Sequence, residues 1–189
     1  MSLLTSSADN GRRLVFVTVG TDCHPFPRLM EWIDVSLDRL DGRVRCLVQH
    51  GVSPPPRKPE AVDYMTYSEM KEAFEAAAVV VSHGGPGTIM MTLAAGKMPI
   101  VVPRRADIGE HVDNHQVAFA RRVAEMQTIC LAEGYDQFLE TLTAAVEDPY
   151  RMQRAGRELG GAPAVAAFAN VVERVVFKPP APAPRVAVS

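Results

Sequence analysis

The chain has 189 residues, of which 47% are hydrophobic and 22% charged, and its formal net charge is -2. This length and composition fit one globular domain, and the small net charge gives no electrostatic case for a nucleic-acid partner. The three cysteines are widely spaced, which predicts free thiols rather than a disulfide framework or a cysteine-based metal site. No leader peptide is recognisable and no apolar run is long enough to cross a bilayer, so we expect a cytoplasmic protein.

Predicted strands alternate with predicted helices along the chain. Strands are predicted at short apolar runs rich in β-branched residues, and helices where apolar residues recur at helical spacing. The predicted strands are 14–19, 44–49, 61–65, 78–81, 100–102 and 127–131. The predicted helices are 26–40, 67–76 with Ser68 as its cap, 86–95, 111–123, 136–147 and 162–176. This alternation predicts an α/β fold with a Rossmann-like, doubly wound and mostly parallel sheet of about six strands.

The two ends of the chain differ in composition from the middle. Residues 1–12 are polar, and residues 178–189 are rich in proline. These compositions predict disordered or extended ends around a single domain of residues 13–177.

A glycine-rich turn follows the predicted strand at 78–81. Its sequence, SHGGPGT at 82–88, contains three glycines, which let the backbone approach a ligand closely, and Pro86, which presets the first helical turn. The start of the following helix offers free N–H groups and a positive dipole end to an anion such as a phosphate. Taken alone, the motif is equally compatible with a tight turn that binds nothing.

Two further segments are expected at the same edge of the sheet. Gly20 and Thr21 follow the first strand, at the carboxyl edge where such sheets bind ligands, although a glycine there can simply end the strand. Asn114, His115 and Gln116 carry the mixed donors and acceptors that sugar hydroxyls require, although Asn114 also suits a helix start. Together with the glycine-rich turn, they predict a nucleotide-sized site.

Other chemistries lack a complete motif. No G-x-S-x-G nucleophile elbow accompanies His83 and its glycines, and neither a Walker A motif nor a G-x-G-x-x-G after the first strand is present. His111 and His115 have the i, i+4 spacing of a helical metal pair, but the Glu of H-E-x-x-H is absent, which favours a solvated or ligand-facing pair. We therefore expect no metal and no cofactor.

The order and spacing of these segments resemble the C-terminal, donor-binding domain of glycosyltransferase family 28, which is one half of a GT-B enzyme. The matching segments are FVTVGT at 16–21, VQHG at 48–51, SHGGPGTIM at 82–90, PIVVPR at 99–104 and GEHVDNHQ at 109–116. The likeness extends to stand-alone subunits of the dolichol-linked UDP-N-acetylglucosamine transferase and of bacterial exopolysaccharide glycosyltransferases. It implies an inverting, metal-independent transfer of a sugar from a UDP-sugar to a lipid-linked acceptor.

The resemblance also implies roles for particular residues. The implied substrate-binding residues are Gly20, Thr21, His83, Gly84, Gly85, Gly87, Thr88, Arg104, Glu110, Asn114, His115 and Gln116. The turn from Gly85 to Thr88 would hold the diphosphate, 114–116 would touch the donor sugar, and Gly20-Thr21 would line the cleft facing the partner half. His83 would either shape the turn or contact a phosphate, and we favour shaping. The position of the family's acidic, ribose-binding residue is Met91 here, which cannot accept those hydrogen bonds.

The acceptor-binding half of a GT-B enzyme is expected from a separate, membrane-associated partner. This partner would supply the general base, so we assign no catalytic residue here, and it would recruit the chain to the inner face of the membrane. Two alternatives are a non-catalytic nucleotide-sugar-binding or scaffolding protein, supported mainly by Met91, and a self-sufficient homodimeric transferase, which the sequence does not favour.

Overall fold

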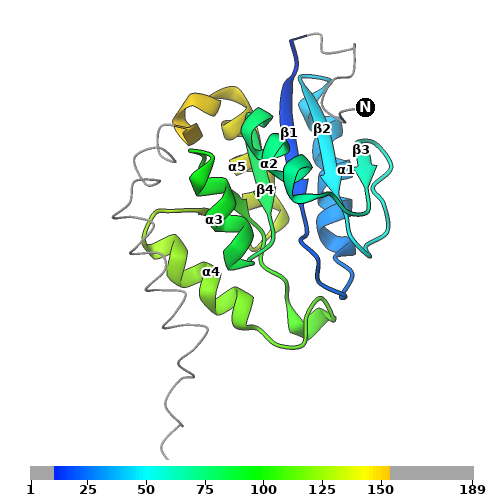
Figure 1. The fold of residues 1–189 in the computed structure, drawn as a ribbon, viewed down its shortest axis with the longest axis vertical. Helices are drawn as coiled ribbons and strands as arrows, with labels where there is room; N and C mark the ends of the chain where they lie inside the picture. The colour runs from blue at the N-terminus through cyan, green and yellow to red at the C-terminus, as the bar shows by residue number, and fades with distance from the viewer. Residues whose placement is uncertain (1–10, 154–189) are drawn as a thin grey trace, which may run out of the picture.

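The computed structural model describes residues 11–153, so the predicted helix at 162–176, the tail at 178–189 and most of the polar N-terminus lie outside the described residues. The fold is a six-stranded, all-parallel sheet flanked by helices, which confirms the predicted α/β class (Figure 1). Its strands are β1 (Arg13–Thr18), β2 (Val44–Gln49), β3 (Glu60–Val62), β4 (Val79–Ser82), β5 (Ile100–Val101) and β6 (Cys130–Leu131). Its helices are α1 (Pro27–Leu40), α2 (Tyr67–Ala76), α3 (Pro86–Ala94), the short 3₁₀ turn η1 (Ala106–Ile108), α4 (His115–Glu125) and α5 (Tyr135–Glu147).

Helices cover both faces of the sheet. Alternate side chains of β1 point to opposite faces: Val15 and Val17 join the core with α1 and α5, whereas Phe16 packs with α2. The ring of Phe16 meets that of Phe74 edge to face, with centroids 5.3 Å apart. Because both faces of the sheet centre are buried, β1 and β4 are nearly continuous apolar runs rather than alternating ones, which makes them recognisable in the sequence.

The sheet order β3-β2-β1-β4-β5-β6 places the change of direction between β1 and β4. These two strands pair in register, with Thr18 beside Ser82 at their carboxyl ends. The loop after β1 and the glycine-rich turn after β4 therefore start side by side and lead away to different neighbours. In open α/β sheets, ligands bind in the crevice at such a switch point.

One predicted helix boundary is wrong in a way that matters for the site. Helix α4 begins at His115 rather than at residue 111. The Asp113 carboxylate accepts the His115 N–H at 2.9 Å, and Asn114 Oδ1 accepts the Ala106 N–H at 2.9 Å. These bonds hold the preceding segment as a loop, because side-chain acceptors compete with helical bonding. His111 and His115 are therefore not one turn apart on a helix.

Three smaller expectations are also corrected. The cap of α2 is Thr66, not Ser68: Thr66 Oγ1 accepts the Glu69 N–H while the Glu69 carboxylate accepts the Thr66 N–H, forming a capping box. The strand predicted at 61–65 is 60–62. The strand predicted at 127–131 shortens to 130–131, and Gln127 has a left-handed φ of 56°, which no strand residue adopts.

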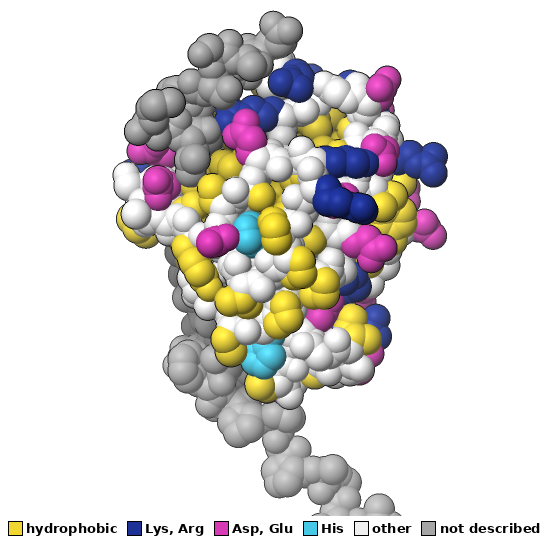
Figure 2. Space-filling view, turned by 90° about the vertical axis from the view of Figure 1, so that its right-hand side faces the viewer, with side chains coloured by type: hydrophobic (Ala, Val, Ile, Leu, Met, Phe, Trp, Pro, Cys, Tyr) yellow, Lys and Arg dark blue, Asp and Glu magenta, His cyan; other side chains and the backbone are white. Residues whose placement is uncertain are grey.

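The surface is mixed in character. On the face drawn in Figure 2, hydrophobic side chains gather near the middle, with acidic and basic side chains around them. Within residues 11–153, no helix combines the length and the apolar character needed to cross a membrane.

Candidate functional site

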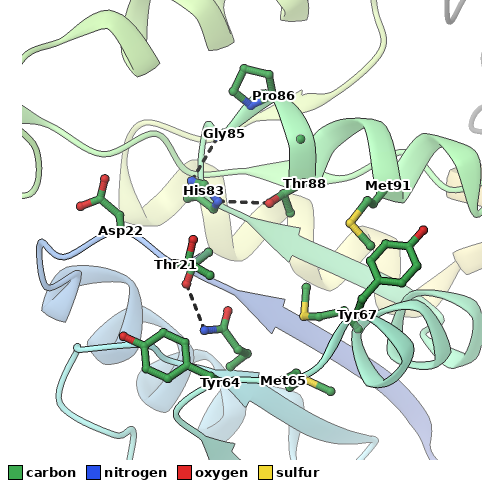
Figure 3. A pocket seen from close by; sticks show the side chains of 14 residues that line it. Thr21, Asp22, Tyr64, Met65, Tyr67, His83, Gly85, Pro86, Thr88 and Met91 are labelled. Atoms are coloured by element: carbon green, nitrogen blue, oxygen red, sulfur yellow. Dashed lines mark hydrogen bonds between the residues drawn. The ribbon is translucent and has the colours of Figure 1, made fainter.

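A cavity of about 630 Å³ opens at the carboxyl edge of the sheet, between the loop after β1 and the turn after β4 (Figure 3). Its lining comes from the ends of β1, β2 and β4, from the connection between β3 and α2, and from the first turns of α3. The lining residues are Gly20, Thr21, Asp22, Gln49, Tyr64, Met65, Tyr67, Met70, His83, Gly85, Pro86, Gly87, Thr88 and Met91.

Half of the site residues implied by the sequence lie on this cavity. Those that line it are Gly20, Thr21, His83, Gly85, Gly87 and Thr88. Those that do not are Gly84, Arg104, Glu110, Asn114, His115 and Gln116. The structure thus brings together the two glycine-containing loops and places the 104–116 segment behind or beside the cavity.

His83 holds the glycine-rich turn in shape. Its Nδ1 accepts the Gly85 N–H at 3.1 Å, so its Nε2 carries the proton and donates to Thr88 Oγ1 at 3.2 Å. Burial, with a smaller contribution from the positive charge of Arg104, lowers the pKa of His83 to about 4. The ring is therefore neutral near pH 7, and the Thr88 hydroxyl, which accepts from His83, keeps its own proton for a ligand.

Two of the glycines are required by this imidazole. A Cβ at Gly85 would lie 2.1 Å from His83 Cε1, and one at Gly20 would lie 2.5 Å from His83 Nε2. Gly20 also has a φ of +73°, a conformation that side chains other than hydrogen disfavour. At Gly87, by contrast, a Cβ would meet nothing within 4 Å. Gly20 and Gly85 make room for His83, whereas Gly87 borders open space.

The start of α3 offers backbone donors to the cavity. The Ile89 N–H bonds the Gly85 carbonyl at 3.2 Å, but the N–H groups of Gly87 and Thr88 bond no acceptor among residues 11–153. The first turn of α3 carries no acidic side chain. Two free amides, the Thr88 hydroxyl and the positive end of a helix dipole together form a site for an anion.

The opposite end of the cavity is apolar. Met91 of α3 and Tyr67 of α2 lie close together in Figure 3, with Met65 and Tyr64 along the lower wall and Asp22 at the far side. Met70 completes this wall. Thioethers and aromatic faces pack well against a flat ring. The cavity therefore suits a molecule with an anionic part and a planar, largely apolar part.

The Arg104 side chain is buried and forms hydrogen bonds with the protein backbone. The residue is 0% exposed. Its Nη1 donates to the carbonyls of His24 and Glu110, at 2.7 and 3.2 Å, and its Nη2 donates to the Val19 carbonyl at 3.0 Å. Its guanidinium also lies 4.8 Å from the centre of the Phe26 ring. These contacts hold the loop after β1 in place from behind.

Glu110 has a similar role in the segment before α4. It is 2% exposed and accepts two bonds from Arg28, at 2.9 and 2.7 Å. It also accepts the Arg105 N–H at 3.0 Å. Such a bidentate pair fixes both geometry and charge. The described contacts make Arg104 and Glu110 positioning residues of the loops around the cavity.

The three residues expected to touch a sugar are consecutive in the chain, but each side chain has different neighbours. Asn114 binds the Ala106 N–H, and the exposed side chain of His115 pairs with Asp113. Gln116 lies beneath Gly84, where an added Cβ would be 3.2 Å from Gln116 Cβ. Its Oε1 is buried and accepts no hydrogen bond from the part of the chain that the structure describes. Among the three, Gln116 is the one with an unsatisfied buried acceptor.

Several lining residues were missed by sequence reasoning. Asp22 directly follows Gly20-Thr21, and Gln49 lies within the VQHG segment, so adjacency to a recognised motif could have identified both. Gln49 Nε2 donates to the Gly20 and Asp63 carbonyls, at 3.0 and 2.9 Å, and so ties β2 to the loop after β1. The apolar wall of 64–70 carries no motif, and only the position of β3 beside β2 reveals it.

Comparison with known proteins gives one family match. The model of the glycosyltransferase family 28 C-terminal domain matches residues 14–174. No curated protein sequence matches the chain.

Several solved structures share the fold. MurG of Acinetobacter baumannii is 16% identical to this chain, with a TM-score of 0.58. The match covers 86% of this chain and 50% of MurG. The glycosyltransferase VinC, solved with dTDP, is 18% identical, with a TM-score of 0.54. The match covers 86% of this chain and 42% of VinC. The calicheamicin glycosyltransferase CalG4 is 20% identical, with a TM-score of 0.51. The match covers 87% of this chain and 44% of CalG4. The chain thus spans half or less of the length of these proteins, and at such identities the likeness shows the fold alone.

Proposed function

The chain belongs to glycosyltransferase family 28, and from this premise we propose that it is the UDP-sugar-binding subunit of an inverting, metal-independent glycosyltransferase. The acceptor is a lipid-linked sugar in polysaccharide or glycolipid biosynthesis. A membrane-associated partner supplies the acceptor site and the general base, and recruits the chain to the cytoplasmic face of the membrane.

The observation that carries this proposal is the cavity, which has backbone N–H donors for an anion at one end and an apolar wall at the other. Its volume, about 630 Å³, lies within the usual range of small-molecule sites. The free N–H groups of Gly87 and Thr88 suit a diphosphate, and the wall of Tyr64, Met65 and Met70 suits a uracil ring. Negative charge builds on the departing UDP during transfer, and helix-start amides fixed before the reaction stabilise that charge without reorganisation. A neutral His83 leaves the Thr88 hydroxyl able to add a third donor.

One feature supports a partner. The apolar rim of the cavity is open: Tyr64 is 53% and Tyr67 75% exposed, although both line the site. A second domain seated over the rim would bury these rings and exclude water from the donor.

Calorimetric titration of the full chain with UDP and UDP-sugars tests the donor site. The informative variant is Gly87→Asp, because a side chain at Gly87 meets nothing within 4 Å and an acidic residue in the first turn of a helix does not harm it. We expect UDP to bind the wild type in the micromolar range and Gly87→Asp to bind at least tenfold more weakly, about 1.4 kcal/mol, through charge repulsion. The matched control, Gly87→Ala, keeps the N–H and should bind normally. Equal binding by both variants would place the diphosphate elsewhere.

A second candidate function has its own observation. Met91 projects into the cavity beside Tyr67 and offers no carboxylate to ribose hydroxyls (Figure 3). This favours a non-catalytic nucleotide-sugar-binding or scaffolding protein. Adding UDP-sugar and the chain to membranes from its source cells, which contain both the lipid-linked acceptor and any membrane partner, separates the two. Chain-dependent sugar transfer supports the transferase subunit, and nucleotide binding without transfer supports the scaffold.

A further inference from the structure

The carboxylate of Asp22 stands at one end of the cavity. In Figure 3, Asp22 and Met91 lie on opposite sides of His83. Among the described residues that line the cavity, Asp22 is the only one with a carboxylate, and no lysine or arginine accompanies it. A negative charge does not help a neighbouring site for an anion. Asp22 therefore has a function of its own, separate from that of the start of α3.

Contacts from two loops hold the Asp22 carboxylate in place. Its Oδ1 accepts the His24 N–H at 2.7 Å and lies 2.7 Å from His24 Nδ1, while its Oδ2 lies 3.3 Å from His111 Nε2. His111 Nδ1 accepts the Asp113 N–H at 3.4 Å, so His111 Nε2 carries the proton and donates it to Asp22. The carboxylate is thus oriented before any ligand arrives.

The Asp22 side chain is ionised near pH 7. Burial alone would raise the pKa of Asp22, but hydrogen bonds from His24 and the charges of Arg104 and His111 outweigh it and hold that pKa below its usual value. Arg104 is 0% exposed and does not line the cavity, whereas the Asp22 side chain is 23% exposed. A ligand in the cavity therefore meets the negative charge of Asp22 directly.

The order of the regions in the cavity places the donor sugar, an argument that rests on the proposed function. With the uracil on the apolar wall and the diphosphate at the amides of Gly87 and Thr88, the sugar follows the diphosphate toward the remaining end, where Asp22 lies. We propose that Asp22 makes this site selective for UDP-sugars whose sugar is uncharged, and against UDP-uronic acids.

The two kinds of donor would interact with Asp22 in opposite ways. The hydroxyls of a neutral hexose can donate charge-assisted hydrogen bonds to a carboxylate. A uronic acid carries a carboxylate of its own in place of the C6 hydroxymethyl group, and it would face Asp22 in a cavity whose described lining has no lysine or arginine. Such like-charge repulsion is an effective way to reject a wrong ligand. Asp22 is therefore a specificity-determining residue and takes no part in the transfer itself.

The test is calorimetric titration of the full chain with UDP and with two matched pairs of nucleotide sugars. The pairs are UDP-glucose with UDP-glucuronate and UDP-galactose with UDP-galacturonate, whose members differ only at C6. In each pair, we expect the neutral member to bind the wild type at least about tenfold more tightly than the uronate. Because the repulsion is coulombic, raising NaCl from about 0.05 to about 0.5 M should lower this ratio.

Asp22→Asn removes the charge and keeps an oxygen that can accept the His24 N–H. It should reduce the ratio within each pair to less than about threefold, since the like-charge term is then absent. The ratio is the readout, because a merely structural effect on the loop would weaken both members alike. Asp107→Asn is the matched control: it makes the same change of charge at an exposed residue outside the cavity and should keep the wild-type ratio.

Binding of UDP alone distinguishes failure of this proposal from failure of the proposed function. If the wild type binds UDP but binds the two members of each pair equally, the selectivity proposal is overturned and the donor site stands. An unchanged ratio in Asp22→Asn, or in high salt, also overturns it, because the discrimination would then come from shape. If neither UDP nor any UDP-sugar binds, the proposed function fails and this proposal fails with it.

Discussion

The imidazole of His83 lies directly against the backbone of Gly85, accepting its N–H at 3.1 Å and leaving no space for a side chain. The glycine at this position in the turn is therefore explained by a neighbouring ring. Gly87, two residues later, faces open space and has a free N–H. The motif combines one glycine that shapes the turn with one that leaves room for a ligand.

Gly85→Ala should destabilise the fold. The added Cβ would lie 2.1 Å from His83 Cε1, so the ring or the turn must move, at a cost of about 1–3 kcal/mol. Urea unfolding measures this, with Gly87→Ala as the control that should cost nothing, because alanine is the better helix former. The double variant Gly85→Ala/His83→Ala should recover part of the loss. Additive effects of the two substitutions would show that the clash is not the cause.

Stability should depend on the protonation of His83. Its pKa is about 4 in the folded chain and about 6.5 when unfolded. Between these values the unfolded chain binds a proton that the folded chain does not, so stability falls as the pH falls from 6.5 to 4, by roughly 3 kcal/mol in total, and this group has no effect above pH 6.5. Urea unfolding of wild type and His83→Gln at pH 7 and pH 4.5 isolates this contribution. The difference between the two proteins should shrink at the lower pH, and a constant difference would contradict the burial of a neutral ring.

Arg104 and Arg105 are adjacent in sequence but should respond differently to substitution. Arg104→Met removes donors from three buried carbonyls and should cost about 3 kcal/mol or more. Arg105 is half exposed and pairs with Asp107, so Arg105→Met should change stability by less than about 0.5 kcal/mol. Chemical denaturation of both variants decides the matter. Normal stability of Arg104→Met, with weakened UDP binding, would restore the direct substrate contact that the sequence suggested.

The sequence predicts the fold well because the central strands are buried on both faces. Segments such as VFVTV and VVVS are apolar at all but one position, and every one of their residues is buried in the sheet. The start of α4 was mispredicted because apolar spacing from His111 onward looks helical. The Asp113 and Asn114 side chains, however, bond backbone N–H groups and delay the helix to His115.

The site was only partly predictable for a different reason. Glycines after strands mark the sheet edge, so the two loops could be identified from local sequence. Whether Arg104 points into the cavity or behind it depends on the packing of Phe26 and the loop after β1, which are about 80 residues away in the chain. The apolar wall at 64–70 depends on strand order, and no local pattern encodes that.

The cap of α2 gives a matched pair of substitutions. Thr66→Ala removes the side chain that accepts the Glu69 N–H and should cost about 1 kcal/mol. Ser68→Ala, two residues later, touches no cap and should be nearly neutral. Guanidinium unfolding of both variants compares them directly. A larger loss for Ser68→Ala would show that the helix begins later than the structure indicates.

Met91→Glu should change nucleotide binding because of where Met91 lies. The side chain borders the cavity next to Tyr67, one helical turn after Thr88, whose hydroxyl and N–H face the proposed diphosphate. A carboxylate there would accept hydrogen bonds from ribose hydroxyls, each worth about 1.5–3 kcal/mol to a charged acceptor, less the cost of partial burial. We therefore expect UDP to bind at least severalfold more tightly to Met91→Glu than to the wild type, measured by calorimetry.

Two controls accompany this titration. Deoxyuridine diphosphate, which lacks the 2′-hydroxyl, should gain less affinity from Met91→Glu than UDP does. Met91→Gln separates the effect of the charge from that of the side-chain shape. Equal gains for both nucleotides would contradict a 2′-hydroxyl contact, and weaker UDP binding to Met91→Glu would show that the apolar wall at Met91 is itself part of the nucleotide site.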